Sequence, residues 1–153
     1  MAKNNHHYFS LHFISSTFFF VSFLFTTELS ASTESFQEWY IKGMEERAHG
    51  NFLSSENFFK KATENNPKNP AVWHMLGLSQ AYNKKYSAAL ESLKKASYYS
   101  PKDIDIKLDI ILILAWSQDY DQATEELNNI LRQKPYCAEA HFLKGRIYYY
   151  RGI

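Results

Sequence analysis

The chain has one cysteine, few glycines and prolines, and almost no net charge, and each shortage excludes a class of protein. A lone Cys137 allows neither an intrachain disulfide framework nor a zinc site built from cysteines. Five glycines and four prolines in 153 residues are too few for a disordered or linker-rich chain. The 17 basic and 16 acidic residues nearly cancel, so the charge of +1 gives no reason to expect nucleic acid or an anionic membrane as a partner. Aromatic residues, by contrast, are abundant at 17%, and the length suffices for one modest domain with its own core.

The N-terminal segment 1–32 has the layout of a secretory signal peptide. A polar start with Lys3 as its one fixed positive charge precedes an apolar run at 13–25, which small residues follow at 30–32. The run is short for a membrane-spanning helix, which needs about 20 residues. We therefore expect residues 1–32 to be a signal peptide and residues 33–153 to be exported, either to a periplasm or by secretion. The alternatives are an uncleaved segment that anchors the chain to a membrane and a buried N-terminal helix. If the signal is cleaved, we expect no stable membrane insertion.

The rest of the chain repeats itself with a constant 34-residue period. Pro67, Pro101 and Pro135 are spaced by this period, and shifting the sequence by the same distance aligns seven columns without a gap. The columns are Pro67/Pro101/Pro135, Trp39/Trp73, Gly43/Gly77/Gly145, Phe52/Tyr86/Tyr120, Ser55/Ala89/Ala123, Phe59/Leu93/Leu127 and Ala62/Ala96/Ile130. Agreement at one period in so many columns indicates that the chain is built from copies of one unit.

Each copy of the repeat is predicted to contain two helices. The first helices are expected at 36–49, 70–83, 104–117 and 138–151, and the second helices at 53–66, 87–100 and 121–134. Asn69 followed by Pro70 is typical of a helix N-terminus, and Asp103 holds the matching position one copy later. The prolines at the ends of the copies cannot continue the preceding helices and are expected to end them. The glycines at 43 and 77 are expected to let the paired helices approach closely.

The third copy departs from the pattern at three positions. Lys107 stands where the first two copies have tryptophan, Ile111 where they have glycine, and Ile130 where they have alanine. Two large side chains at a point of close approach should push the paired helices apart or tilt them. The segment 104–114 also begins with the apolar–polar alternation of a strand, but its place in the 34-residue register favours a helix.

These residues resemble the tetratricopeptide repeats, whose signature runs from Trp-x2-Leu-Gly through Tyr and Ala to a closing Pro. The second copy carries the fullest match, with Trp73, Leu76, Gly77, Tyr86, Ala89, Leu93, Ala96 and Pro101. The resemblance implies an all-α fold of antiparallel helix-turn-helix units stacked in a right-handed superhelix. The units are expected at 36–69, 70–103 and 104–137, with one further helix from a partial copy at 138–153.

In proteins of this family the first helices line a concave groove and contact ligands at four positions each. Carried over to this chain, the resemblance implies a peptide-binding groove formed by Tyr40, Met44, Arg47, His74, Leu78, Leu108, Leu112, Phe142, Arg146 and Tyr149. This largely apolar set suits a protein or peptide with an apolar or amphipathic segment, and its two arginines suit acidic groups on that ligand. Some members clamp a C-terminal carboxylate with Lys and Asn where Tyr40 and Met44 stand here, so we expect no such clamp. The alternative is that the same side chains pack against neighbouring helices.

No residue pattern indicates an enzyme. The sequence has no His-Glu-x-x-His, no Gly-x-Ser-x-Gly and no glycine-rich phosphate loop, and we expect neither a cofactor nor a metal. We therefore expect a non-catalytic adaptor or assembly scaffold that binds a protein or peptide in its concave groove. The alternative is the structural N-terminal portion of a longer array without a ligand of its own. It arises because the last helix keeps apolar residues such as Phe142 and Ile147, whereas terminal repeats are usually polar.

Overall fold

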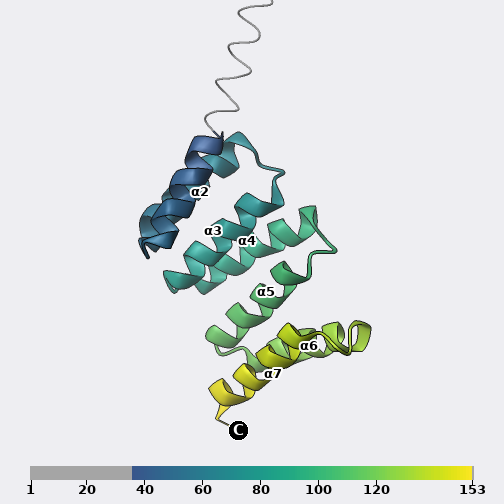
Figure 1. Ribbon diagram of the computed structural model, residues 1–153. Helices are drawn as coiled ribbons and strands as arrows, with labels where there is room; N and C mark the ends of the chain where they lie inside the picture. Colours follow the sequence, from purple (N-terminus) through teal and green to yellow (C-terminus); the bar gives the residue numbers. More distant parts are fainter. Residues whose placement is uncertain (1–35, 153) are drawn as a thin grey trace, which may run out of the picture. The chain divides into compact units, whose positions relative to one another are not determined.

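The computed structural model describes residues 36–152, which form seven helices joined by short turns, with no strand among them (Figure 1). The first helix spans 36–48, and it is followed by α2 (Phe52–Asn65), α3 (Pro70–Tyr82), α4 (Tyr86–Tyr99), α5 (Ile104–Trp116), α6 (Tyr120–Gln133) and α7 (Ala138–Arg151). Every predicted helix is present, and each end lies within one residue of its predicted position. Segment 104–114 is helical, as its register predicted. The predicted signal peptide at 1–32 lies outside the described residues.

The helix ends follow from the local sequence. Asn69 caps α3, because its side-chain oxygen accepts a hydrogen bond from the backbone N–H of Ala71 at 2.9 Å. Asp103 caps α5 in the same way through the N–H of Asp105 at 3.0 Å. Helices α2, α4 and α6 each end two residues before the proline of their copy. The predicted caps and stops are therefore confirmed.

The turn between the two helices of a copy uses a left-handed residue that the sequence analysis did not single out. Gly50 (φ 78°), Lys84 (φ 61°), Gln118 (φ 68°) and Gly152 (φ 78°) hold the same position in successive copies. Glycine adopts this conformation without strain, whereas a residue with a Cβ is strained by it. The turns at Lys84 and Gln118 therefore hold strain that the turn at Gly50 does not.

Close approach between paired helices depends on the predicted glycines. A Cβ atom placed on Gly43 would lie 2.7 Å from the Phe59 ring, and one placed on Gly77 would lie 2.7 Å from Cγ of Leu93. In the third copy the buried Ile111 takes this position. The backbones of α5 and α6 accordingly stay within 8 Å of each other over less of their length than those of α3 and α4. This agrees with the expected separation of the third pair.

The hydrophobic core runs along the array as three successive clusters. The first is centred on Phe59, Ala62, Val72 and Leu76, and the second on Ala81, Ala89, Leu93, Ala96, Ile106 and Ile113. The third comprises Leu108, Ile111, Leu114, Ala115, Ala123, Leu127, Ile130, Ala140, Leu143 and Ile147. Each cluster joins helices of one copy to helices of the next, so packing within a copy and packing between copies share one core.

One carboxylate is buried in this framework. Glu56 on α2 is 1% exposed, and its oxygens lie 2.8 Å from the ammonium groups of Lys60 and Lys85 and accept a hydrogen bond from Asn83 at 3.1 Å. Burial by itself raises the pKa of Glu56, but the hydrogen bonds from Lys60, Lys85 and Asn83 together outweigh it and leave the pKa below its ordinary value. This group ties α2 to the turn between α3 and α4.

Candidate functional site

The first helices of successive copies form one row. The backbones of α3 and α5, and those of α5 and α7, approach within 8 Å, and the three helices follow one another along the array in Figure 1. The groove residues implied by the family resemblance lie on this row and on helix 36–48. The structure gives them three different environments.

Several of these residues are already occupied by contacts within the fold. Leu108 is 9% exposed and belongs to the third core cluster, so its assignment to the groove is corrected: the helices packed on α5 cover it. Tyr40 is half-buried, with its ring centroid 5.7 Å from that of Phe59. His74 Nε2 lies 2.6 Å from Oδ2 of Asp109 on α5. This last contact joins two first helices across the row.

The two arginines of the set contact aromatic rings. The Arg47 guanidinium lies 5.8 Å from the centroid of the Tyr82 ring, and its Nε is buried without a hydrogen-bond partner among residues 36–152. Arg146 donates a hydrogen bond to the hydroxyl of Tyr150 at 2.7 Å, and this bond is the main cause that lowers the Tyr150 pKa. Both arginines are half-buried, so they are held by the fold as well as being accessible.

Phe142 and Tyr149 are exposed for a different reason from the rest of the set. They are 69% and 80% exposed, whereas their register equivalents one copy earlier, Leu108 and Ala115, are buried. The earlier pair is covered by the copy that follows, and no described helix follows α7. Phe142 and Tyr149 are therefore exposed side chains of the last described helix, and their place in the groove stays a prediction.

Further accessible apolar side chains lie three or four residues away from some of the expected positions, on the same side of the first helices. Register positions 41, 44 and 48 lie on one side of a helix, because they are spaced by three and four residues. We call this surface the first-helix face; its exposed and half-buried apolar members are Ile41, Met44, Met75, Leu78, Tyr82, Leu112 and Trp116. Met44, Leu78 and Leu112 were expected from the sequence. The other four were missed, although their helical spacing combined with the shift from copy to copy identifies them.

The aromatic members of the first-helix face contact one another. Tyr82 stacks on Phe52 at a centroid distance of 4.5 Å and meets the edge of Trp116 at 5.7 Å. Tyr82, Trp116 and Tyr150 also line a shallow hollow of about 390 Å³ at the turn end of the row. These rings therefore pack against other aromatic rings of the fold while remaining partly accessible to a ligand.

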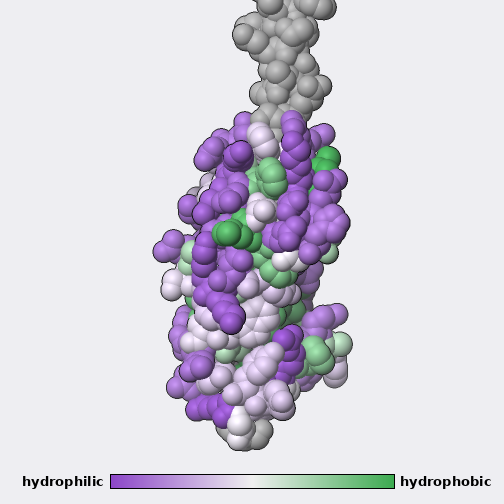
Figure 2. All heavy atoms as spheres, turned by 90° about the vertical axis from the view of Figure 1, so that its left-hand side faces the viewer, coloured by the Kyte–Doolittle hydropathy of each residue, from purple (hydrophilic) through white to green (hydrophobic). Residues whose placement is uncertain are grey.

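Figure 2 shows one face of the molecule, with many hydrophilic side chains in its upper part, side chains of intermediate hydropathy over much of its lower part, and apolar side chains in small separate areas. Small separate areas of this kind are ordinary for a protein surface. Within 36–152, none of the helices combines the length and the apolarity needed to cross a bilayer. The same residues hold no group of three His, Cys, Asp or Glu side chains placed to bind a metal ion.

The fold and this face define an all-helical repeat protein. Two family models, both described as tetratricopeptide repeat, match residues 58–91 and 80–147. Together the matches span more than half of the chain. The chain belongs to the tetratricopeptide repeat family.

Solved structures agree with this assignment. The tetratricopeptide domain of Arabidopsis OM64 superimposes with a TM-score of 0.68 at 16% identity, over 76% of this chain and 96% of that one. YrrB, described as a tetratricopeptide protein with an unusual peptide-binding site, gives 0.65 at 22% identity, over 82% and 63%. The first such domain of Spaghetti (RPAP3), bound to the HSP90 peptide SRMEEVD, gives 0.68 at 15% identity, over 78% and 95%. At these identities the likeness shows the fold alone. No curated protein sequence matches the chain.

Proposed function

We propose that the chain is a non-catalytic adaptor that binds a peptide segment of another protein on its first-helix face. The observation that carries this proposal is the recurrence of accessible apolar side chains at one register position, Met44, Leu78 and Leu112, on three successive first helices. A repeated row of this kind offers one equivalent contact per copy. The peptide-bound domain of Spaghetti and the peptide-binding site named for YrrB support the general class of ligand.

The spacing of the row indicates the chemistry of the peptide. Neighbouring packed helices lie about 8–10 Å apart, and a peptide in the polyproline II conformation has three residues per turn and rises about 3.1 Å per residue. Apolar side chains three residues apart on such a peptide lie on one side of it and would therefore meet successive members of the row. Arg47 and Arg146, near its two ends, favour acidic groups outside this apolar core. Tyr40 and Met44 stand where a carboxylate clamp would need Lys and Asn, so the peptide needs no free C-terminus.

The test compares two double variants with the same chemical change. Ile41→Glu with Met44→Glu places charge on the first-helix face, and Leu53→Glu with Tyr98→Glu places it on exposed apolar residues of α2 and α4. Peptides selected from a displayed random library against the unmodified chain are then titrated against both variants. We expect the first variant to bind about tenfold more weakly or worse and the second to bind unchanged. Equal binding by the unmodified chain and the first variant would remove the first-helix face as the site.

We further propose that the chain is exported and that its segment 1–32 is a cleaved signal peptide. The support is the order of a basic start, a short apolar run and small residues in the sequence. N-terminal sequencing of the protein from its native cells should find a new N-terminus close to residue 33. An intact Met1 on the mature protein would contradict cleavage.

A further inference from the structure

In the second copy a tryptophan, Trp73, fills the space between the second helices α2 and α4, and the first copy has a tryptophan, Trp39, at the same register position. The Trp73 indole N–H donates a hydrogen bond to the carbonyl oxygen of Pro67 at 2.7 Å, and the Lys95 ammonium lies 4.2 Å from the ring centroid. Trp73 also packs against both the first and the second core cluster. Trp39 is placed similarly, with the Lys61 ammonium 4.4 Å from its ring centroid. We call this space the tryptophan slot.

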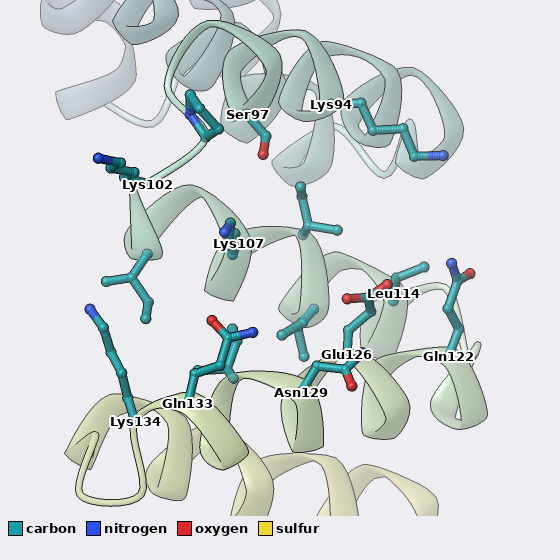
Figure 3. Close-up of a pocket in the computed structure, with 15 residues that line it drawn as sticks. Lys94, Ser97, Lys102, Lys107, Leu114, Gln122, Glu126, Asn129, Gln133 and Lys134 are labelled. Atoms are coloured by element: carbon teal, nitrogen blue, oxygen red, sulfur yellow. The ribbon is translucent and has the colours of Figure 1, made fainter.

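The third copy has the slot without the tryptophan. Pro101, Lys107 and Asn129 are the register equivalents of Pro67, Trp73 and Lys95, and all three line one pocket of about 640 Å³ between α4, α5 and α6 (Figure 3). A volume between about 300 and 1,000 Å³ is typical of a ligand site. The pocket therefore arises because a lysine replaces the side chain that fills the equivalent space elsewhere.

The walls of the pocket combine apolar and basic groups. Its apolar lining consists of Ile104, Ile110, Ile111, Leu114 and Ile130. Four lysines line it as well, against one acidic residue, Glu126. In Figure 3 Lys102 and Lys134 lie at one end, Lys94 and Glu126 toward the other, and Lys107 between them.

The basic groups are available to a ligand. Among the described residues, none of the four lysine side chains has an ion-pair or hydrogen-bond partner, whereas Lys60 and Lys85 on the first half of the array are paired with Glu56. The Pro101 carbonyl oxygen, unlike that of Pro67, receives no hydrogen bond from the described part of the chain. A ligand with carboxylates would pair with the lysine ammonium groups, and one N–H donor on the same ligand would bind the Pro101 carbonyl oxygen.

We propose that this pocket binds an acidic segment of a partner protein through a single tryptophan side chain. The indole ring takes the empty tryptophan slot, and its N–H donates to the Pro101 carbonyl as Trp73 donates to Pro67. Carboxylates on either side of the anchoring tryptophan pair with Lys102, Lys107 and Lys134. The pocket shares no residue with the first-helix face, so it is a second docking site that stands independently of the first.

A synthetic peptide tests the proposal on the full chain. The probe is a fluorescein-labelled, acetylated peptide with one tryptophan between two pairs of glutamates, and binding is followed by fluorescence anisotropy. Replacing its tryptophan by alanine, or its glutamates by glutamines, should each weaken binding about tenfold or more. If the peptide without tryptophan binds as well as the probe, the indole does not occupy the slot. If the peptide without glutamates binds as well, the lysines do not pair with carboxylates.

Three variants of the chain locate the site. Lys107→Trp supplies the missing ring from within and should abolish binding, while Lys102→Glu reverses one charge beside the pocket and should weaken binding about tenfold or more. Lys68→Glu is the matched control, because Lys68 is the register equivalent of Lys102 beside the slot that Trp73 already fills. It should bind as the unmodified chain does.

Three outcomes would contradict binding at the pocket. Absence of saturable binding overturns the proposal, as does undiminished binding by Lys107→Trp with a normal helical circular dichroism spectrum. If Lys68→Glu and Lys102→Glu weaken peptide binding equally, the net charge of the chain attracts the acidic peptide and no specific site at the pocket is needed. Should Lys107→Trp fail to fold, the comparison between Lys68 and Lys102 still decides, because both lie in exposed loops.

Discussion

Replacing glycine by alanine should have opposite effects on stability at two equivalent positions of the array. Gly77 and Gly145 hold the same register position on first helices two copies apart. Gly77 faces the second helix of its own copy, whereas a Cβ placed on Gly145 would have no neighbouring helix of the described residues within 4 Å. The two substitutions add the same methyl group to the same kind of helix, so they differ only in what that group meets.

The expected magnitudes follow from these surroundings. A Cβ on Gly77 would lie 2.7 Å from Leu93 Cγ and 3.1 Å from the backbone oxygen of Ala89, and Leu93 is fully buried and cannot turn away. Overpacking of this kind costs about 1–3 kcal/mol, while alanine gains about 1 kcal/mol over glycine within a helix. Gly77→Ala should therefore lower the free energy of unfolding by up to about 2 kcal/mol. A Cβ on Gly145 meets nothing within 4 Å, so Gly145→Ala should raise it by about 1 kcal/mol.

Urea unfolding followed by circular dichroism at a helical wavelength measures both effects. Free energies are obtained by linear extrapolation, and the slope must be compared between variants because arrays of repeats can lose two-state behaviour. The gap between the two variants isolates the packing term, since the helix-propensity gain is common to both. If Gly77→Ala proves as stable as Gly145→Ala, the close approach of α3 and α4 does not require glycine and the reasoning fails.

Three further substitutions test other parts of the framework. Glu56→Gln should lower the free energy of unfolding by about 1–3 kcal/mol at pH 7. Because the folded pKa of Glu56 lies below its ordinary value of 4.5, the unmodified chain loses this advantage as pH falls through that lowered pKa, and urea unfolding near pH 3 should show a smaller gap. Gln118→Gly should stabilise the chain by about 1 kcal/mol, measured the same way, by relieving the left-handed backbone. A double-mutant cycle with His74→Ala and Asp109→Ala should give a coupling of about 0.5–1 kcal/mol; a coupling of zero would show that their 2.6 Å contact contributes nothing.

The helices and their ends were predictable because they depend on residues close together in the chain. Asn69 needs only the N–H groups that follow it to cap α3, and a proline stops a helix whatever lies elsewhere. Segment 104–114 shows the limit of this local reasoning. Its first residues alternate as a strand would, and only the longer register of the repeat placed it in a helix.

The accessible surface was less predictable because burial depends on what stacks on each copy. Leu108 and Phe142 share one register position, yet Leu108 is in the core and Phe142 is exposed on the last described helix. A set of contact positions applied uniformly to every copy cannot separate them. The same set of positions does not include Tyr82 and Trp116. These two residues are accessible because they lie on the side of their helices that neighbouring copies do not cover.

The third copy shows how a departure from the repeat pattern can open a site without breaking the array. Losing a tryptophan from the slot removes apolar contact between α4 and α6, and the isoleucines at 111 and 130 replace glycine and alanine in the same region. Both isoleucines are buried in the third cluster, so they restore core contacts while keeping α5 and α6 from the close approach seen between α3 and α4. The two kinds of change act together: the isoleucines hold the helices apart, and the lysine leaves the resulting space unfilled. A return of Lys107 to tryptophan alone would therefore fill the pocket, whereas a return of Ile111 to glycine alone would leave a deeper one.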